Sequence, residues 1–233
     1  MARCKENNIT RLFLPNVDLA SVPLVFSLVK TYPDICFPML GLHPCSVKAD
    51  WQNVLSAIKA AAHEPSIVAI GEIGIDLYWD KTTLTEQIQA FHEQIAWAKS
   101  LKLPIVIHCR EAFEEVFQVL EEERGNDLRG IFHCFAGNVQ QAHQAIDLGF
   151  YLGIGGVLTY KNSGLDQVVS EIDLKHIVLE TDSPYLTPVP FRGKPNESSY
   201  LIYVARKVAE LHQTSLENVA AITTANSMQV FGV

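Results

Sequence analysis

Residues 66–76 read SIVAIGEIGID, an apolar run that ends in a glutamate and continues to an aspartate. The run from Ser66 to Gly71 predicts a strand covered on both faces, because buried parallel strands are nearly continuous in residues such as Ile and Val. Glu72 stands at the carboxyl end of this strand, where parallel α/β barrels place their active-site residues. If the strand stays extended, its period of two turns Gly74 and Asp76 toward the same side as Glu72.

Three further apolar runs end in the same way. His108 follows LPIVI, His133 follows GIF, and Asp182 closes the run HIVLETD. Together with Glu72, these side chains form a set that holds divalent zinc, manganese or magnesium. A carboxylate such as Asp182 can also take a proton from an attacking water. One such residue at the end of each of four predicted strands indicates a metal-dependent hydrolase, with Glu72 and Asp182 as the catalytic candidates.

Strand and helix patterns alternate along the whole chain. We expect strands at 9–14, 35–42, 66–71, 104–108, 130–132, 150–154 and 175–180. We expect helices at 19–31, 51–62, 84–100, 112–124, 139–148, 165–172, 197–211 and 216–230. Capping boxes are predicted at Thr83–Glu86 and Thr214–Glu217. This alternation predicts right-handed βαβ units around a parallel sheet, and the 233 residues suit a single domain spanning residues 1–233.

The predicted strands number seven, whereas a closed barrel of the TIM type, (β/α)₈, has eight. The opening residues 3–8, RCKENN, are typical of the end of a helix, with cationic residues followed by asparagine. We therefore expect an incomplete barrel in which the first strand and most of the first helix are absent. Its open seam would leave unpaired strand edges, and self-association through that seam is expected. The alternative is a doubly wound open sheet, which accommodates seven strands.

Composition excludes several classes of protein. The net charge is −8 and there is no basic run, which argues against a protein that wraps duplex DNA through many phosphate contacts. No apolar stretch approaches the ~20 residues that span a bilayer, so no membrane partner is expected. The five cysteines contain no C-x-x-C pair, and the polar amino terminus lacks the pattern of a signal peptide. These features favour the reducing cytoplasm.

Other residues near the predicted strand ends complete the list of candidates. Arg110 shares the strand alternation of His108 and could bind phosphate oxygens bidentately. His43 follows another predicted strand, and Arg192 lies in a loop rich in glycine and proline. We expect these three to contact the substrate; the alternatives are a turn histidine before proline for His43 and surface charge alone for Arg192. Cys109 and Cys134 alternate with the candidate histidines, so both are expected to turn away from them and pack as small apolar residues.

Five stretches of the sequence resemble the TatD-like metal-dependent deoxyribonucleases, which are relatives of the amidohydrolase barrels. The stretches are GLHP at 41–44, GEIGID at 71–76, PIVIHCR at 104–110, HCFAG at 133–137 and ETDSPYLTPVPFRGKPNESSYL at 180–201. The resemblance covers nearly the whole chain. It implies a barrel with a two-metal centre (zinc, manganese or magnesium) that hydrolyses phosphodiester bonds of DNA, often as a 3′ to 5′ exonuclease on single strands or 3′ ends.

The resemblance also implies roles for individual residues. Glu72 matches the bridging carboxylate, His108 and His133 match the histidines of the second metal, and Asp182 matches the carboxylate of the first. Arg110 would then contact phosphate. The family opens with a His-x-His motif that this sequence lacks, so weak or single-metal occupancy and impaired catalysis are expected. The alternatives are hydrolysis of a small amide or ester metabolite and a non-catalytic barrel remnant that only binds a partner.

Overall fold

The computed structural model describes residues 1–62, 66–125 and 127–233. These residues fall into two compact units. We call Arg11–Gly130 the central unit, and Met1–Thr10 together with Ile131–Val233 the terminal unit. None of the described helices combines the length and the apolar character that crossing a bilayer requires.

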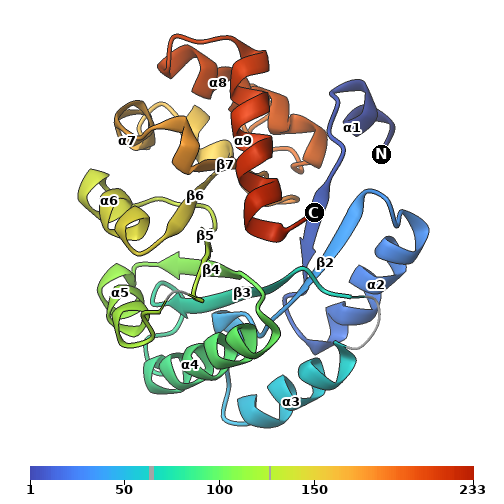
Figure 1. Ribbon diagram of the computed structural model, residues 1–233, viewed down its shortest axis with the longest axis vertical. Helices are drawn as coiled ribbons and strands as arrows, with labels where there is room; N and C mark the ends of the chain where they lie inside the picture. The colour runs from blue at the N-terminus through green and yellow to red at the C-terminus, as the bar shows by residue number, and fades with distance from the viewer. Residues whose placement is uncertain (63–65, 126) are drawn as a thin grey trace. The chain divides into compact units, whose positions relative to one another are not determined.

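The central unit alternates parallel strands with helices, drawn from blue to green in Figure 1. Its strands are β1 (Leu12–Pro15), β2 (Cys36–Leu40), β3 (Ala69–Asp76) and β4 (Ile105–Arg110). Its helices are α2 (Val22–Thr31), α3 (Trp51–Ala61), α4 (Leu84–Leu101) and α5 (Phe113–Glu122), with 3₁₀ turns η1 (Leu19–Ser21) and η2 (Pro44–Ser46). Each strand pairs in parallel with the next one along the chain. Strand β5 (Gly130–Phe132) begins at the last residue of this unit.

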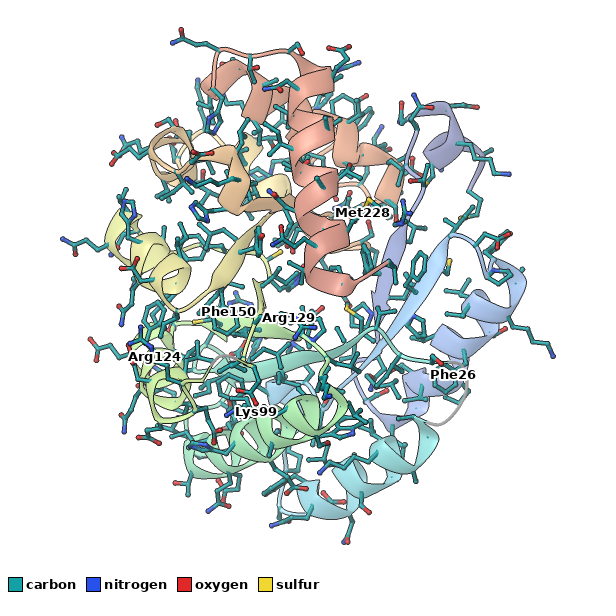
Figure 2. All side chains as sticks on the ribbon, viewed as in Figure 1. Phe26, Lys99, Arg124, Arg129, Phe150 and Met228 are labelled. Carbon is teal, nitrogen blue, oxygen red and sulfur yellow. The ribbon has the colours of Figure 1, made fainter. Side chains whose placement is uncertain are left out.

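The terminal unit holds both ends of the chain. Its elements are α1 (Ala2–Glu6), α6 (Val139–Asp147), β6 (Phe150–Ile154), η3 (Gly156–Thr159), α7 (Leu165–Glu171), η4 (Leu174–His176), β7 (Ile177–Leu179), η5 (Ser198–Tyr200), α8 (Leu201–Leu211) and α9 (Leu216–Phe231). Strands β6 and β7 are parallel neighbours. The ring of Phe150, labelled in Figure 2, meets that of Phe132 edge-on with centroids 5.6 Å apart, and both rings are buried.

Every predicted strand and helix occurs among the described residues, with the ends shifted by a few positions. The largest difference is β3, which was predicted to end at Gly71 and extends to Asp76. In both units the neighbouring strands are consecutive in the chain. A doubly wound sheet reverses its strand order at a switch point, and the strands that the structure describes show no such reversal in either unit. The open-sheet alternative is therefore wrong.

The predicted capping boxes are not formed as expected. Thr83 caps α4 without a side-chain bond to the helix backbone, because its hydroxyl accepts a hydrogen bond from Nε2 of Gln87 at 3.0 Å. The helix α9 begins at Leu216 as predicted, but its N-cap is Ser215 rather than Thr214, and the hydroxyl of Ser215 accepts from the backbone N–H of Asn218 at 3.1 Å. In both cases the helix is where the pattern places it and only the cap differs.

The predicted helix end at residues 3–8 corresponds to α1 and the turn that follows it. Asn8 has a φ of +55°, the left-handed conformation expected for asparagine at such a position. The guanidinium of Arg3 donates from Nε to Oε1 of Glu197 at 2.6 Å, and Nδ2 of Asn7 donates to the carbonyl of Ser199 at 3.0 Å. These bonds attach α1 to η5 within the terminal unit.

Strand β3 carries a bulge at Glu72. Gly71 pairs with Val106 and Ile73 with Ile107, so Glu72 has no partner in the register of β4. Bulges of this kind redirect a side chain at the end of a strand. Two residues further on, Gly74 has a φ of +136°, and a Cβ there would lie 2.1 Å from a carbonyl oxygen of β4. Only glycine lets the two strands approach so closely.

A buried asparagine fixes a strand end in each unit. After β1, Oδ1 of Asn16 accepts from the N–H of Gly41 and its Nδ2 donates to the carbonyl of Gly41, both at 2.8 Å. On α9, Nδ2 of Asn226 donates to the carbonyls of Leu174 and Ile177 at 2.8 and 2.7 Å. Both amides are nearly inaccessible to solvent, so each satisfies backbone groups that would otherwise be buried without a partner.

Candidate functional site

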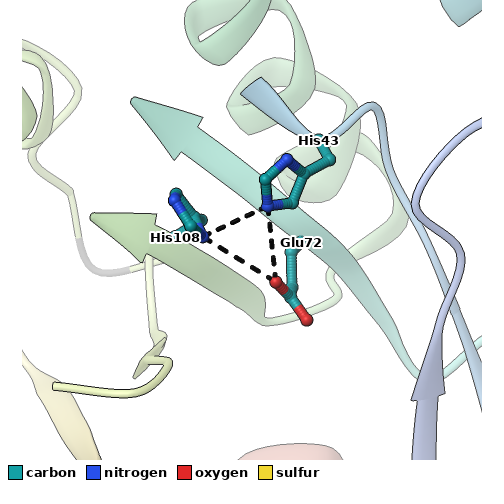
Figure 3. Close-up of side chains that lie close together, drawn as sticks. All are labelled: His43, Glu72 and His108. Carbon is teal, nitrogen blue, oxygen red and sulfur yellow. Dashed lines mark hydrogen bonds and ion pairs between the residues drawn. The ribbon is translucent and has the colours of Figure 1, made fainter. Parts of the chain in front are cut away.

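In the central unit, the ends of β3 and β4 bring two carboxylates to opposite sides of one imidazole. Nε2 of His108 lies 2.8 Å from Oδ2 of Asp76, and Nδ1 of the same ring lies 4.0 Å from Oε2 of Glu72. The alternation expected from the sequence therefore holds despite the bulge, since Glu72 and Asp76 both face His108. Figure 3 shows Glu72 and His108 together with a third side chain, His43.

His43 comes from the segment after β2 and caps η2. Its Nε2 lies 3.2 Å from Nδ1 of His108 and 3.7 Å from Oε2 of Glu72. Ligand atoms of these three residues all lie within 4.8 Å of one another. The cluster thus contains two sequence-predicted metal ligands and a residue that was predicted to contact substrate.

The hydrogen bonds around His43 indicate which of its nitrogens carries the proton. The backbone N–H of Cys45 donates to Nδ1 of His43 at 3.1 Å, so in the neutral ring Nε2 must be the protonated nitrogen. That N–H points at His108 and Glu72. In this tautomer His43 is a hydrogen-bond donor rather than a metal ligand, which agrees with a role in contacting substrate and leaves that role a prediction.

Asp76 holds both the imidazole and its own loop. Its Oδ1 accepts from the backbone N–H groups of Tyr78 and Trp79 at 3.0 and 3.1 Å, while Oδ2 accepts from His108. Burial alone would raise the pKa of Asp76, but the hydrogen bonds from His108 and the loop outweigh it and lower the pKa well below the ordinary value. Asp76 therefore stays ionised and keeps the proton of His108 on Nε2, so that Nδ1 is the nitrogen presented to Glu72.

The terminal unit contains a matching arrangement after β5 and β7. Nδ1 of His133 lies 2.9 Å from Oε2 of Glu180, and its Nε2 lies 3.5 Å from Oδ1 of Asp182. Oε1 of Glu180 accepts from the backbone N–H of Cys134 at 2.7 Å. Burial tends to raise the pKa of Glu180, but the charge and hydrogen bond of His133 outweigh it, and the pKa is lowered. A Cβ on Gly153 would lie 2.3 Å from Oε2 of Glu180, so this carboxylate occupies space that a side chain there would fill.

Cys134 corrects one expectation. It was predicted to turn away from His133, but its sulfur lies within 4.8 Å of ligand atoms of His133 and Glu180. The strand ends at Phe132 and Cys134 has a φ of +43°, so strand alternation no longer applies at this position. Burial raises the pKa of the Cys134 thiol well above its usual value, which favours a neutral thiol. Burial raises the pKa of the Cys109 thiol to about 12, while its predicted direction away from His108 stays a prediction.

Asp182 lies in a loop that is fixed by one asparagine. Nδ2 of Asn196 donates to the carbonyls of Thr181 and Tyr185, both at 2.6 Å, and so closes the loop around Asp182. Asp182 itself has a φ of +53°, a conformation that short polar residues tolerate. The loop geometry sends its carboxylate toward Nε2 of His133.

The two arginines predicted to bind substrate both stack on tyrosines of their own unit. The guanidinium of Arg110 lies 3.7 Å from the ring centre of Tyr78, and that of Arg192 lies 4.0 Å from the ring centre of Tyr160. Both arginines are exposed. Their substrate contacts remain predictions.

Two residues of the site were not selected from the sequence as functional. Glu180 was not considered, and Asp76 was predicted to face the same side of the strand as Glu72 but was given no role. The signal for Glu180 was available, because it stands two residues before Asp182 at the end of a predicted strand, where the period of two gives both the same direction.

The donor atoms in each unit suit a divalent cation. Glu72 and His108 offer oxygen and nitrogen in one unit, and Asp182 and His133 do so in the other; this mixture is typical of zinc and manganese sites. Metal-ligating histidines commonly donate their second N–H to a carboxylate, which is the relation that Asp76 and Glu180 have to the two rings. The chemistry of the donors therefore fits the metal that the sequence predicts.

Comparisons with known proteins agree with this assignment. The family described as TatD related DNase matches residues 1–232. The chain is 38% identical over 232 residues to the uncharacterized metal-dependent hydrolase YabD of Bacillus subtilis, covering 99% of this chain and 91% of that protein. It is 32% identical over 240 residues to the 3′-5′ ssDNA/RNA exonuclease TatD of Salmonella typhimurium, covering 100% of this chain and 92% of that protein. The crystal structure of YJJV, a TatD homologue from Escherichia coli, superposes with a TM-score of 0.91 at 28% identity, covering 100% of this chain and 90% of that one.

These matches define the fold and the class of protein. The fold is of the TIM-type α/β barrel class, with seven strands among the described residues where a closed barrel has eight, and the class of protein is a metal-dependent hydrolase, as the sequence predicted. The chain belongs to the TatD-related DNase family.

Proposed function

We propose that this hydrolase removes nucleotides from the 3′ end of single-stranded DNA by hydrolysing phosphodiester bonds. The observation that carries the proposal is the pair of histidines that each lie between two carboxylates, one bonded to one ring nitrogen and the other facing the second nitrogen, in a chain whose relatives include proteins named 3′-5′ ssDNA/RNA exonucleases. We propose Glu72 and His108 as metal ligands in the central unit, and His133 and Asp182 in the terminal unit.

A bound divalent ion would supply a nucleophile at neutral pH and neutralise charge on the reacting phosphate. The side chains of the chain contribute orientation and proton handling. Asp76 keeps Nδ1 of His108 free of a proton, and Glu180 does the same for Nε2 of His133. Two bound cations would also offset the acidic residues locally, which allows a protein of net charge −8 to accept an anionic strand.

Asp182 and His43 are proposed to act on the substrate itself. The carboxylate of Asp182 can accept the proton of the attacking water, since it is exposed to about a quarter of its possible extent at the end of β7. The protonated Nε2 of His43 can donate a hydrogen bond to a phosphate oxygen beside Glu72. Arg110 and Arg192 are proposed to contact the strand outside the reacting bond.

The test is hydrolysis of a single-stranded oligodeoxynucleotide labelled at its 5′ end, with Mg²⁺ or Mn²⁺ and with or without chelator. We expect a ladder of products shortened from the 3′ end that disappears with chelator and with Glu72→Gln. The matched control is Glu114→Gln, an exposed glutamate in the first turn of α5, which should leave the ladder unchanged.

Other outcomes would contradict specific parts of the proposal. Internal cleavage of an oligonucleotide with a blocked 3′ end would show an endonuclease. Chelator-sensitive hydrolysis of amide or ester substrates without any nucleic-acid cleavage would favour a metabolite hydrolase. Binding of the oligonucleotide without turnover under every metal condition would favour a non-catalytic binding protein.

A further inference from the structure

Two large aromatic side chains stand exposed directly after β3. Tyr78 is 49% exposed and Trp79 is 70% exposed. Their rings meet edge-on, with centroids 4.8 Å apart and an interplanar angle of 88°. Single exposed apolar residues are common on protein surfaces. Because burying aromatic area is strongly favourable, two exposed aromatic rings side by side form a surface on which a ligand can bind.

The backbone that carries this pair is held in place from three directions. Oδ1 of Asp76 accepts from the N–H groups of both aromatic residues, and the N–H of Leu77 donates to the carbonyl of Arg110 at 2.9 Å. The side chain of Gln87, almost fully buried, donates to the carbonyl of Asp76 at 3.1 Å and accepts from its N–H at 2.8 Å. A ligand that stacks here would therefore find rings whose backbone is already ordered, which lowers the entropy cost of binding.

A cationic plane completes the surface. The guanidinium of Arg110 lies 3.7 Å from the ring centre of Tyr78 and 5.6 Å from that of Trp79. Guanidinium groups stack on aromatic faces and also attract phosphate, so the three side chains combine a planar apolar surface with a positive charge. We call Tyr78, Trp79 and Arg110 the aromatic platform.

The platform is joined to the candidate metal ligand through one carboxylate. Asp76 bonds the platform backbone with Oδ1 and Nε2 of His108 with Oδ2. A small pocket of about 40 Å³ lies beside Trp79 and is lined by residues that include Pro44 and Thr83. The exposed ring faces of Tyr78 and Trp79 are the surface on which a planar ligand can stack.

We propose that the aromatic platform stacks an unpaired nucleobase of the substrate strand, a role that rests on the proposed function. Every base has a π-face, so the platform would bind bases with little sequence preference. Bases in a duplex are already stacked on one another and their faces are unavailable. The platform would thus give the enzyme its preference for single strands, and Arg110 would hold the adjoining phosphate.

The experiment measures binding of a fluorescently labelled oligothymidylate by anisotropy in the presence of chelator, so that no hydrolysis occurs. An oligonucleotide of equal length in which the bases are replaced by abasic sites serves as the second ligand. We expect Trp79→Ala to raise the Kd for the base-containing strand about tenfold, corresponding to the loss of one base stack. Its Kd for the abasic strand should change by less than about twofold, because the phosphate contacts remain.

Two further variants sharpen the assignment. Arg110→Lys keeps the charge and loses the planar stack, so it should weaken binding of the base-containing strand more than that of the abasic strand. Tyr32→Ala, an exposed aromatic residue at the end of α2, is the matched control and should change neither Kd. Circular dichroism should show that all variants are folded.

The outcomes separate this inference from the proposed function. An unchanged Kd for Trp79→Ala, or equal weakening for both ligands, would overturn the platform even if the wild-type protein cleaves DNA. A base-dependent loss of binding in a protein that shows no cleavage would support the platform and contradict the exonuclease proposal.

Discussion

Each unit places a histidine between two carboxylates, but the carboxylate that bonds the ring does so through a different nitrogen in the two units. In the central unit Asp76 takes the Nε2 side of His108 and leaves Nδ1 facing Glu72. In the terminal unit Glu180 takes the Nδ1 side of His133 and leaves Nε2 facing Asp182. The difference shows that the tautomer is set by where the orienting carboxylate stands and not by the histidine itself.

The orienting carboxylates differ in what else they hold. The second oxygen of Asp76 accepts hydrogen bonds from the backbone N–H groups of Tyr78 and Trp79. The second oxygen of Glu180 accepts from the N–H of Cys134, the residue next to the histidine that Glu180 orients. Disturbing Asp76 should therefore affect a neighbouring surface, while disturbing Glu180 should affect only its own histidine. The following experiments test this comparison in order of decreasing expected effect.

The largest effect should come from the carboxylates that face the presented nitrogens. Glu72→Gln and Asp182→Asn should each lower kcat for 3′ shortening by on the order of 10²- to 10⁴-fold, because each removes a charged group that we propose as a metal ligand or proton acceptor. Steady-state assays on a labelled single strand measure this. If either variant keeps near wild-type activity, the two units do not contribute equally and the symmetry drawn above fails.

Smaller losses should follow from the orienting carboxylates. Asp76→Asn and Glu180→Gln should each weaken metal affinity by about 10- to 100-fold, the usual cost of removing a partner behind a ligating histidine. Competition with a fluorescent chelator measures the affinity. Asp166→Asn, exposed at the start of α7, is the control and should have no effect. Only the Asp76 variant should also weaken binding of base-containing strands, since only Asp76 bonds the platform backbone.

The buried asparagines extend the comparison to stability. Asn16→Ala and Asn226→Ala should each lower the free energy of unfolding by about 1–3 kcal/mol, because each leaves buried backbone groups without partners. Urea denaturation measures the change. Asn53→Ala on the exposed side of α3 should have almost no cost. A loss confined to one unit would show that the two strand ends are not equally dependent on such bonds.

The smallest expected effect depends on pH. The hydrogen bond from Lys99, labelled in Figure 2, lowers the pKa of Glu123, and His92 lowers it further. Together these two effects outweigh burial, which raises the pKa. A lowered folded-state pKa means that the stabilisation is present above the unfolded pKa and is lost as pH falls through the folded pKa. Glu123→Gln should lower stability by less than about 1 kcal/mol near pH 7, and the difference should shrink as the pH falls below the ordinary glutamate pKa of about 4.3.

The terminal unit offers the counterpart to that test. Hydrogen bonds from Arg3 and Ser199 lower the pKa of Glu197, so Glu197→Gln should show the same sign of pH dependence. Denaturation curves of both variants at a series of pH values make the measurement. A stability difference that grows on acidification in either variant would contradict the assigned sign.

Much of this structure follows from local patterns in the sequence. The strands and helices were predicted because hydrophobic periodicity reports burial, and burial is what a barrel imposes on every element. The four strand-end residues Glu72, His108, His133 and Asp182 were found for the same reason, since the end of a buried run marks the rim of the sheet. Hydrophobic periodicity does not predict which side chains each of these residues contacts.

The parts that could not be predicted depend on contacts between distant residues. The cap of α4 differs because Gln87 uses the hydroxyl of Thr83 while tying down the preceding loop. The direction of Cys134 depends on a positive φ just after a three-residue strand. The pairing of Glu180 with His133 joins residues that are 47 positions apart. Periodicity carries no information about such pairings.

The close packing of Glu180 and Phe132 against Gly153 has a consequence for variation in this protein. A methyl group there would sit 2.3 Å from Oε2 of Glu180 and 2.9 Å from the carbonyl oxygen of Phe132. The backbone carbonyl cannot yield, so Glu180 would have to swing away and release His133. The substitution Gly153→Ala should therefore disturb the orientation of His133, although residue 153 is not itself one of the proposed site residues.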